Sequence, residues 1–224
     1  MNKESKIYVT LVTLTISTIC AVLVSSVYVW MKPKYAQNKA IDVKKNILLA
    51  AGHDLRRFSN SDEIIAAYED SIVRKEVYIG GIEHFVYYIR ANDGDKTFEG
   101  IILPISGKGL FSTMYGFIAL EMDFNTVRYI TFYDHGETPG MGAQITSPAW
   151  QRQWIGKQIF DEQWNPRIRV VSRSLDEAVV PRHHQVDGIT GATLTANGVE
   201  RMVWHWLGEE GFLNYLRENV GRYD

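Results

Sequence analysis

The sequence predicts an α+β protein: a single N-terminal transmembrane helix, followed by a soluble domain in which helices pack against an antiparallel β-sheet. Three observations support this prediction. A long uncharged run lies near the N-terminus, strand patterns joined by short turns fill the middle, and an apolar helical pattern follows towards the C-terminus. Runs of strands followed by helices are typical of α+β domains.

The uncharged run extends from Ile7 to Met31 and carries aromatic residues near both ends, among them Tyr8 and Trp30. A helix of this length crosses the hydrocarbon layer of a bilayer, which is about 30 Å thick, and aromatic residues suit its interfaces. A cleaved signal peptide is the alternative, but the run is too long for the hydrophobic part of such a peptide and lacks a small-residue cleavage site. We therefore expect a retained single-pass anchor over residues 1–32.

Composition excludes several classes of function. The 24 basic and 26 acidic residues nearly balance, so no basic surface for nucleic acid is expected. Cys20 is the only cysteine, which rules out an internal disulfide and a cysteine-ligated iron–sulfur cluster. Redox chemistry therefore needs an organic cofactor. His183 and His184 lack a cysteine or acidic cluster at ligand spacing, so we predict no metal site, and no catalytic residue is assigned.

The segment after the anchor predicts two helices. Ala36–Ala51 has apolar residues at helical positions and is stopped by Gly52. A second, short helix is expected from Ser59, with Asp62 completing a capping pattern. From Val77 the pattern changes to strands.

The strand patterns form two predicted hairpins. Phe85–Arg90 and Phe98–Leu103 flank the turn Asn92-Asp93-Gly94-Asp95. Thr113–Met122 and Thr126–Tyr133 form the better pair, joined across Asp123-Phe124-Asn125. A short helix over Pro148–Trp154, a strand over Arg167–Ser172 and two C-terminal helices then follow, the first with Val199, Met202, Val203 and Trp206 on one apolar face.

A glycine-rich loop leaves the last strand as His135-Gly136-Glu137-Thr138-Pro139-Gly140-Met141-Gly142. Its three glycines let backbone amides approach a ligand closely. Such loops are also common turns, so this signal alone is weak.

The stretch Asp187-Gly188-Ile189-Thr190-Gly191-Ala192-Thr193 ends a loop and opens the first C-terminal helix. Thr190 is a good N-cap type, and Gly191 and Ala192 are too small to obstruct the helix start. Thr193 then falls at about the third helical position, where unpaired amides and the helix dipole favour a phosphate. Its hydroxyl could bind a phosphate or carry one as an ester. An ordinary cap followed by a surface threonine is the commoner arrangement and remains open.

Three segments together resemble the FMN-binding domain family. Asp187–Thr193 is similar to the motif at which FMN is esterified through its phosphate to the last threonine. Leu110–Ala119 and Tyr133–Gly142 resemble blocks found in the C subunits of the sodium-translocating NADH:quinone oxidoreductases. Two positions depart from that pattern, Phe111 where tryptophan is expected and Met141 where leucine is usual, and both keep an apolar surface for the flavin ring.

The resemblance implies one covalent FMN on Thr193. The other residues implied to bind the cofactor are Asp187, Thr190, Gly191 and Ala192 around the attachment and Glu137, Thr138, Gly140 and Met141 along the ring. It also implies three parts of the chain: an anchor over 1–32, an N-terminal part of the soluble domain over 33–105 and the FMN-binding domain over 106–224.

As a partner set, the resemblance implies a six-subunit membrane complex that pumps sodium, and a flavin transferase that attaches FMN from FAD with a divalent cation. It places the protein in the bacterial inner membrane with the FMN domain on the periplasmic side. The lysines that follow the anchor favour a cytoplasmic domain instead, by a charge rule that long domains often ignore. The alternatives are the G subunit of an Rnf-type ferredoxin:NAD complex and a membrane-tethered flavin-binding sensor without a catalytic partner.

Overall fold

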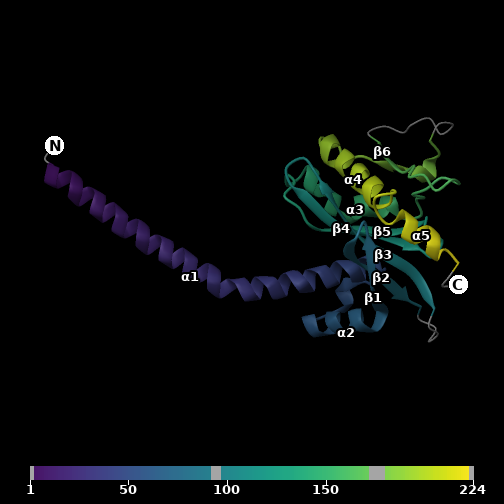
Figure 1. Ribbon diagram of the computed structural model, residues 1–224, viewed down its shortest axis with the longest axis horizontal. Helices are drawn as coiled ribbons and strands as arrows, with labels where there is room; N and C mark the ends of the chain where they lie inside the picture. Colours follow the sequence, from purple (N-terminus) through teal and green to yellow (C-terminus); the bar gives the residue numbers. More distant parts are fainter. Residues whose placement is uncertain (1–2, 92–96, 172–179, 222–224) are drawn as a thin grey trace. The chain divides into compact units, whose positions relative to one another are not determined.

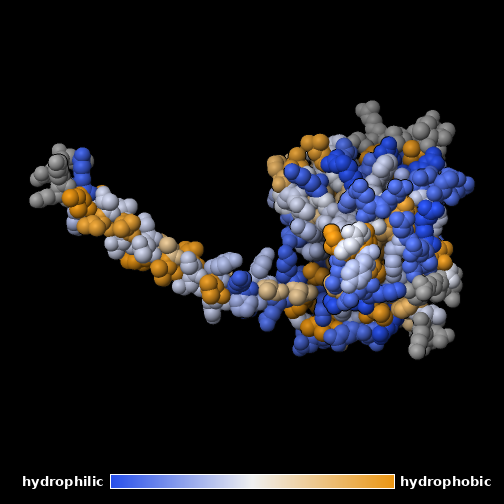
Figure 2. Space-filling model, viewed as in Figure 1, coloured by the Kyte–Doolittle hydropathy of each residue, from blue (hydrophilic) through white to orange (hydrophobic). Residues whose placement is uncertain are grey.

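The computed structural model describes residues 3–91, 97–171 and 180–221 (Figure 1). The chain divides into two units, Met1–Asp42 and Val43–Asp224. Helix α1 (Lys3–Ala50) contains the apolar run and, in the part of the chain described, is the one helix long and apolar enough to cross a membrane. Figure 2 shows hydrophobic residues along much of this run, whose side chains are exposed.

The separate helix expected over Ala36–Ala51 is wrong, because α1 continues through this segment without a break. Pro33 lies inside the helix and does not end it, although a proline there removes one backbone hydrogen bond. The predicted stop at Gly52 is confirmed. Gly52 has φ +97°, and the amides of Gly52 and His53 bond to the carbonyls of Leu49 and Leu48, each at 3.0 Å. These two hydrogen bonds form the pattern that ends a helix at a glycine in the left-handed conformation.

A short turn, η1 (Leu55–Arg57), leads to α2 (Ser61–Ser71). The predicted cap is wrong by one residue, because Asn60 rather than Ser59 caps the helix. Asn60 Oδ1 accepts a hydrogen bond from the Glu63 amide at 2.9 Å, and the Glu63 carboxylate accepts one from the Ser59 amide at 2.8 Å. The reciprocal cap therefore uses Glu63 where Asp62 was expected.

The predicted antiparallel sheet is confirmed as a five-stranded meander in the order β1-β2-β3-β4-β5 (Figure 1). The first strand begins earlier than the expected Val77, and the turn Asn92–Asp95 lies outside the described residues. Both predicted strand pairs are present. The strands are β1 (Ile72–Ile79), β2 (Ile82–Arg90), β3 (Phe98–Lys108), β4 (Thr113–Glu121) and β5 (Val127–Asp134).

The turn between β1 and β2 consists of Gly80 and Gly81, with φ of +57° and +80°, the left-handed pair that two-residue hairpins require. Among the described residues, no atom lies within 4 Å of a Cβ added at Gly80, so only backbone strain opposes a side chain there. We expect Gly80→Val to lower the unfolding free energy by about 1–2 kcal/mol, and Gly80→Asn to lower it less, since asparagine tolerates this conformation. Equal losses in urea unfolding would contradict this explanation.

The remaining elements lie after β5, and two apolar clusters cover opposite faces of the sheet. Ile101 and Leu103 point into one cluster, which α4 covers, and Ile102 points into the other, which the end of α1 and α2 cover. The predicted helix after Pro148, the strand after Arg167 and the C-terminal helices are found. The later elements are η2 (Gly142–Thr146), α3 (Pro148–Gln151), η3 (Arg152–Trp154), β6 (Arg169–Val171), η4 (Arg182–His184), β7 (Gln185–Asp187), α4 (Thr193–Trp206) and α5 (Leu213–Asn219).

Two features fix α4 on the domain. Gly198 lets the helix approach β3, since a Cβ at this position would lie 2.8 Å from the carbonyl oxygen of Lys108. Two residues further along, the Glu200 carboxylate accepts hydrogen bonds from the Val170 amide at 2.7 Å and from Arg169 at 2.9 Å. β6 pairs in parallel with β7. This pairing fixes the direction of β7, which leads to the start of α4.

Candidate functional site

The start of α4 differs from the sequence-based expectation. Thr190 is not the N-cap: Ala192 occupies that position and Thr193 is the first helical residue. Gly191 adopts φ +77° and the Ala192 amide bonds to the carbonyl of Ile189 at 3.0 Å. Residues 189–192 therefore close a turn of their own, and the helix begins only after it.

Because of this later start, Thr193 is the N-terminal residue of the helix. The amides of the first turn, from Thr193 to Thr195, are those that an α-helix leaves without partners of its own. Thr193 and Leu194 are exposed, whereas Thr195 is buried. The positive end of the helix dipole adds to these amides, so the surface around the Thr193 hydroxyl favours a phosphate.

The glycine-rich loop meets the helix start through Met141. A Cβ at Gly191 would lie 3.5 Å from the Met141 methyl carbon. Gly140, with φ +76°, turns the chain ahead of Met141, whose amide bonds back to the carbonyl of Thr138 at 3.2 Å. Thr138, Gly140 and Met141 are exposed, so the structure brings this part of the loop to the side of the attachment motif.

Glu137 belongs to the same loop, but its carboxylate is turned inward and the residue is only 4% exposed. It accepts hydrogen bonds from the amides of Leu110, Phe111 and Ser112 at 3.1, 3.0 and 3.3 Å. A fourth bond comes from the Thr195 hydroxyl at 2.5 Å. The sequence patterns did not identify Thr195 or these three amides as part of the site.

The hydrogen bonds to Glu137 decide its titration. Burial would raise the pKa of Glu137, but the bonds from the Thr195 hydroxyl and the three amides together outweigh burial and lower the pKa below its ordinary value of 4.5. A carboxyl with a lower pKa in the folded chain stabilises the fold above its unfolded pKa, and this contribution is lost as the pH falls through the folded pKa.

We therefore expect the unfolding free energy of the wild-type chain to approach that of Glu137→Gln on acidification, because protonated Glu137 no longer gains from its donors. Urea unfolding of both proteins between neutral pH and about pH 3 measures this difference. A difference that stays constant over the whole range would contradict the lowered pKa.

The segments that meet here carry four exposed apolar side chains. They are Leu110, Phe111, Met141 and Leu194, exposed by 44%, 67%, 47% and 58%. Each belongs to a segment that contacts Glu137 or adjoins one that does. A planar apolar ring with a phosphate tail fits this arrangement: the apolar side chains offer it a surface, and the start of α4 offers donors for the phosphate.

Asp187 makes its contacts with residues outside these groups. Its carboxylate faces Arg182 at 3.4 Å, its amide donates to Gln153 Oε1 at 3.2 Å, and its carbonyl accepts from the Trp150 indole at 2.9 Å. These contacts fix the end of β7 and hence the direction in which residues 188–192 leave it.

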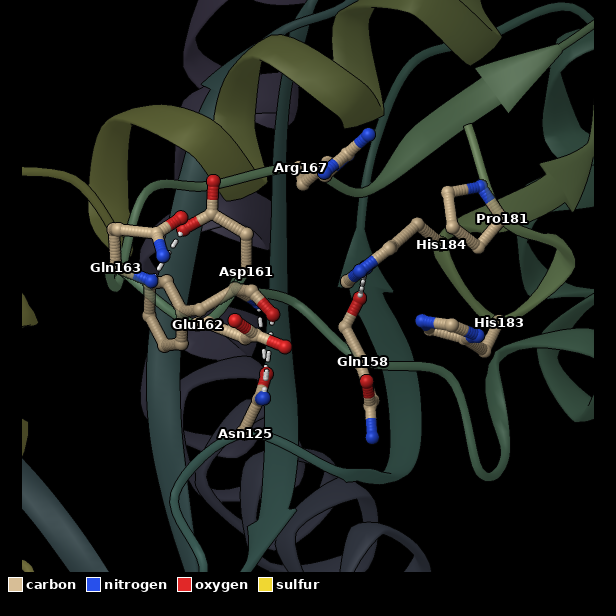
Figure 3. Close-up of a pocket in the computed structure, with 10 residues that line it drawn as sticks. Asn125, Gln158, Asp161, Glu162, Gln163, Arg167, Pro181, His183 and His184 are labelled. Carbon is tan, nitrogen blue, oxygen red and sulfur yellow. Dashed lines mark hydrogen bonds between the residues drawn. The ribbon is translucent and has the colours of Figure 1, made fainter. Parts of the chain in front are cut away.

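A second concave region, with a cavity of about 680 Å³, lies beside η4. In Figure 3, His183 and His184 lie on one side of it and Asp161 on the other. The two histidines lie in a helical turn, and their ring centroids are only 4.4 Å apart. His184 Nδ1 lies 2.7 Å from the carbonyl of Gln158, and burial lowers the pKa of His184. Among the described residues, no group of three His, Cys, Asp or Glu side chains could hold a metal ion.

The fold and the loop–helix junction define a flavin-binding domain. A family model described as FMN-binding domain matches residues 109–208. The chain is 34% identical to the C subunit of the Na(+)-translocating NADH-quinone reductase of Yersinia pestis, over 97% of this chain and 94% of that protein. It is 33% identical to the protein of the same name from Pseudomonas aeruginosa, over 96% of each.

Two solved structures share the fold. The crystal structure of Shewanella oneidensis NqrC has a TM-score of 0.70 at 26% identity and covers 82% of this chain and 98% of that one. The C subunit of the Na(+)-translocating NADH-quinone reductase from Parabacteroides distasonis has a TM-score of 0.69 at 25% identity and covers 83% and 96%. The chain belongs to the family formed by the C subunits of the Na(+)-translocating NADH-quinone reductases.

Proposed function

We propose that this chain is the electron-carrying flavoprotein subunit of a sodium-pumping NADH:quinone reductase and holds one FMN through a phosphoester to Thr193. FMN, once bound, supplies the ability to accept and release electrons. The observation that carries the proposal is the exposed hydroxyl of Thr193 on the first residue of α4, beside the loop that carries Met141. Family membership supports the flavin and the enzyme; the covalent bond rests on this position of Thr193.

Attachment uses the Thr193 side chain as the acceptor. Its hydroxyl loses a proton and its oxygen forms a bond to the FMN phosphorus, while the pyrophosphate bond of FAD breaks and AMP leaves. The product remains an anion, which the amides of the first turn of α4 stabilise. A flavin transferase with a divalent cation would perform this step, and the exposure of Thr193 gives such an enzyme access.

The residues around Thr193 would bind and orient the FMN. Gly191 and Ala192 keep the approach to Thr193 free of bulk, and Thr190 lies exposed on the same turn. Thr138 and Gly140 present backbone amides to the ring edge, and Met141 presents its apolar side chain. The ion pair between Asp187 and Arg182 fixes the start of the segment 188–192. Protein groups of this kind shift the potential of a flavin rather than supply its chemistry.

The test is the intact mass of the full chain after expression with a flavin transferase. We expect one FMN-sized increment that survives denaturation and maps to the peptide containing Thr193. A chain that remains at its unmodified mass beside a transferase active on a control substrate would refute the covalent site.

We further propose that α1 anchors the chain in the inner membrane, beside the other five subunits, and that the flavin domain lies on the periplasmic side. Glu209 is exposed in this domain and Cys20 is the only native thiol. In a Cys20→Ser background, Glu209→Cys should react in intact cells with a maleimide that cannot cross the inner membrane. Labelling only after this membrane is opened would place the domain in the cytoplasm.

A further inference from the structure

The inward carboxylate of Glu137 connects three segments that are distant in sequence. The amide donors Leu110–Ser112 lie 25 to 27 residues before it, and Thr195 lies 58 residues after it. These segments are the loop between β3 and β4, the glycine-rich loop and the first turn of α4. Each of them also presents a side chain to the proposed flavin site: Phe111, Met141 and Thr193.

Two glycines enclose this carboxylate. A Cβ at Gly109 would lie 2.5 Å from Glu137 Oε1, and one at Gly142 would lie 2.7 Å from the Thr195 hydroxyl oxygen. Successive amides such as those of Leu110, Phe111 and Ser112 form a concave site for an anion. Here an anion of the protein itself fills it.

The bonds fix two orientations. With their amides directed at Glu137, Leu110 and Phe111 leave their side chains on the surface, exposed by 44% and 67%. Thr195 points inward to the carboxylate, and Thr193, two positions earlier on the helix, is thereby held facing outward.

We propose that Glu137 is a positioning residue of the flavin site: its carboxylate fixes the Phe111 loop and the first turn of α4 relative to each other before any flavin is attached. This inference rests on the proposed function for its purpose, but its structural part concerns the chain alone. The charge matters because a carboxylate accepts from all four donors. A glutamine amide group presents hydrogens to at least one of them and leaves that donor unpaired.

The first measurement uses the full chain without flavin and follows hydrogen exchange of the amides of Leu110, Phe111 and Ser112. We expect at least tenfold faster exchange in Glu137→Gln, with the amides of Ile118 and Ile130 unchanged as reporters of the sheet. Thr195→Val removes one donor and should speed exchange at Leu110, whereas Thr195→Ser keeps the hydroxyl and should match the wild type. If Glu137→Gln also exchanges faster in the sheet, the variant is destabilised as a whole. The comparison of exchange at Leu110 between Thr195→Val and Thr195→Ser then tests the positioning role.

The second measurement is the reduction potential of the covalently loaded proteins. Removing a fixed negative charge from the wall of the site favours the reduced flavin, so Glu137→Gln should raise the equilibrium constant for reduction about tenfold, which is about 30 mV for a two-electron couple. Thr195→Val retains the charge and should shift it by less.

Unchanged exchange in both Glu137→Gln and Thr195→Val would overturn the positioning role, and so would an unchanged potential in loaded Glu137→Gln. A wild-type chain that takes up no covalent flavin refutes the proposed function instead. In that case the exchange measurement still decides whether Glu137 holds the two segments together.

Discussion

Thr193→Ala should abolish covalent attachment of flavin to this chain. Alanine has no oxygen to form the bond to phosphorus, and Thr193 is the exposed hydroxyl on the first residue of α4. Removing it leaves the fold intact, because the side chain is outside both apolar clusters. The measurement is the mass of the denatured chain after incubation with FAD and a flavin transferase, with in-gel flavin fluorescence as a second readout.

Thr190→Ala is the matched control, since Thr190 is also an exposed threonine and lies three positions earlier, in the turn that precedes α4. This variant should keep the FMN increment, and Thr193→Ser should keep it too, because serine retains the hydroxyl. A covalent flavin on Thr193→Ala, or its loss from Thr190→Ala alone, would assign the bond to a different residue.

Trp154→Ala should cause the largest loss of stability among single changes near the site, about 3–5 kcal/mol in unfolding free energy. The Trp154 side chain is fully buried at 0% exposure and its ring lies 5.8 Å from that of Trp150. Trp150 in turn bonds to the carbonyl of Asp187 at 2.9 Å. The cavity left by Trp154→Ala therefore weakens the support of the loop that leads to Thr193.

The control is Ile155→Ala at the adjacent, half-exposed position, which should change the unfolding free energy by no more than about 0.5 kcal/mol. Trp154→Phe should cost less than its lost volume suggests, because among the described residues the indole N–H of Trp154 has no hydrogen-bond partner. Urea unfolding measures all three variants. Equal losses for Trp154→Ala and Ile155→Ala would refute this description of the core.

The main elements could be predicted from the sequence because their signals are local. The period of two along Thr113–Met122 predicts β4, and the period of 3.6 around Met202 predicts α4, since each pattern follows from one apolar face. The hairpin at Gly80 was missed although the Gly-Gly signal is present in the sequence. The uninterrupted α1 was missed because the apolar run ends at Met31 and a separate helix was expected from Ala36, whereas one helix continues through both segments.

The candidate site was predictable only in part. A threonine followed by two small residues suggests a helix start, but the left-handed Gly191 places the helix two residues later than the motif alone implies. Glu137 was expected beside the ring as part of a recognisable loop. Its inward bonds could not be anticipated, because they depend on how β3, β4 and α4 pack, and no local pattern states which distant amides meet a carboxylate.

The stop of α1 at Gly52 has a consequence for any shortened form of this protein. Ile47 and Leu48 are 1% and 0% exposed and belong to the same cluster as Ile102. The helix that carries the long apolar run therefore also supplies part of the interior of the domain. Proteolysis before Val43 removes the apolar run and keeps this contribution, whereas removal of α1 up to Gly52 opens the cluster to water. The domain can be separated from the apolar run of α1, but not from the last residues of this helix, which form part of its core.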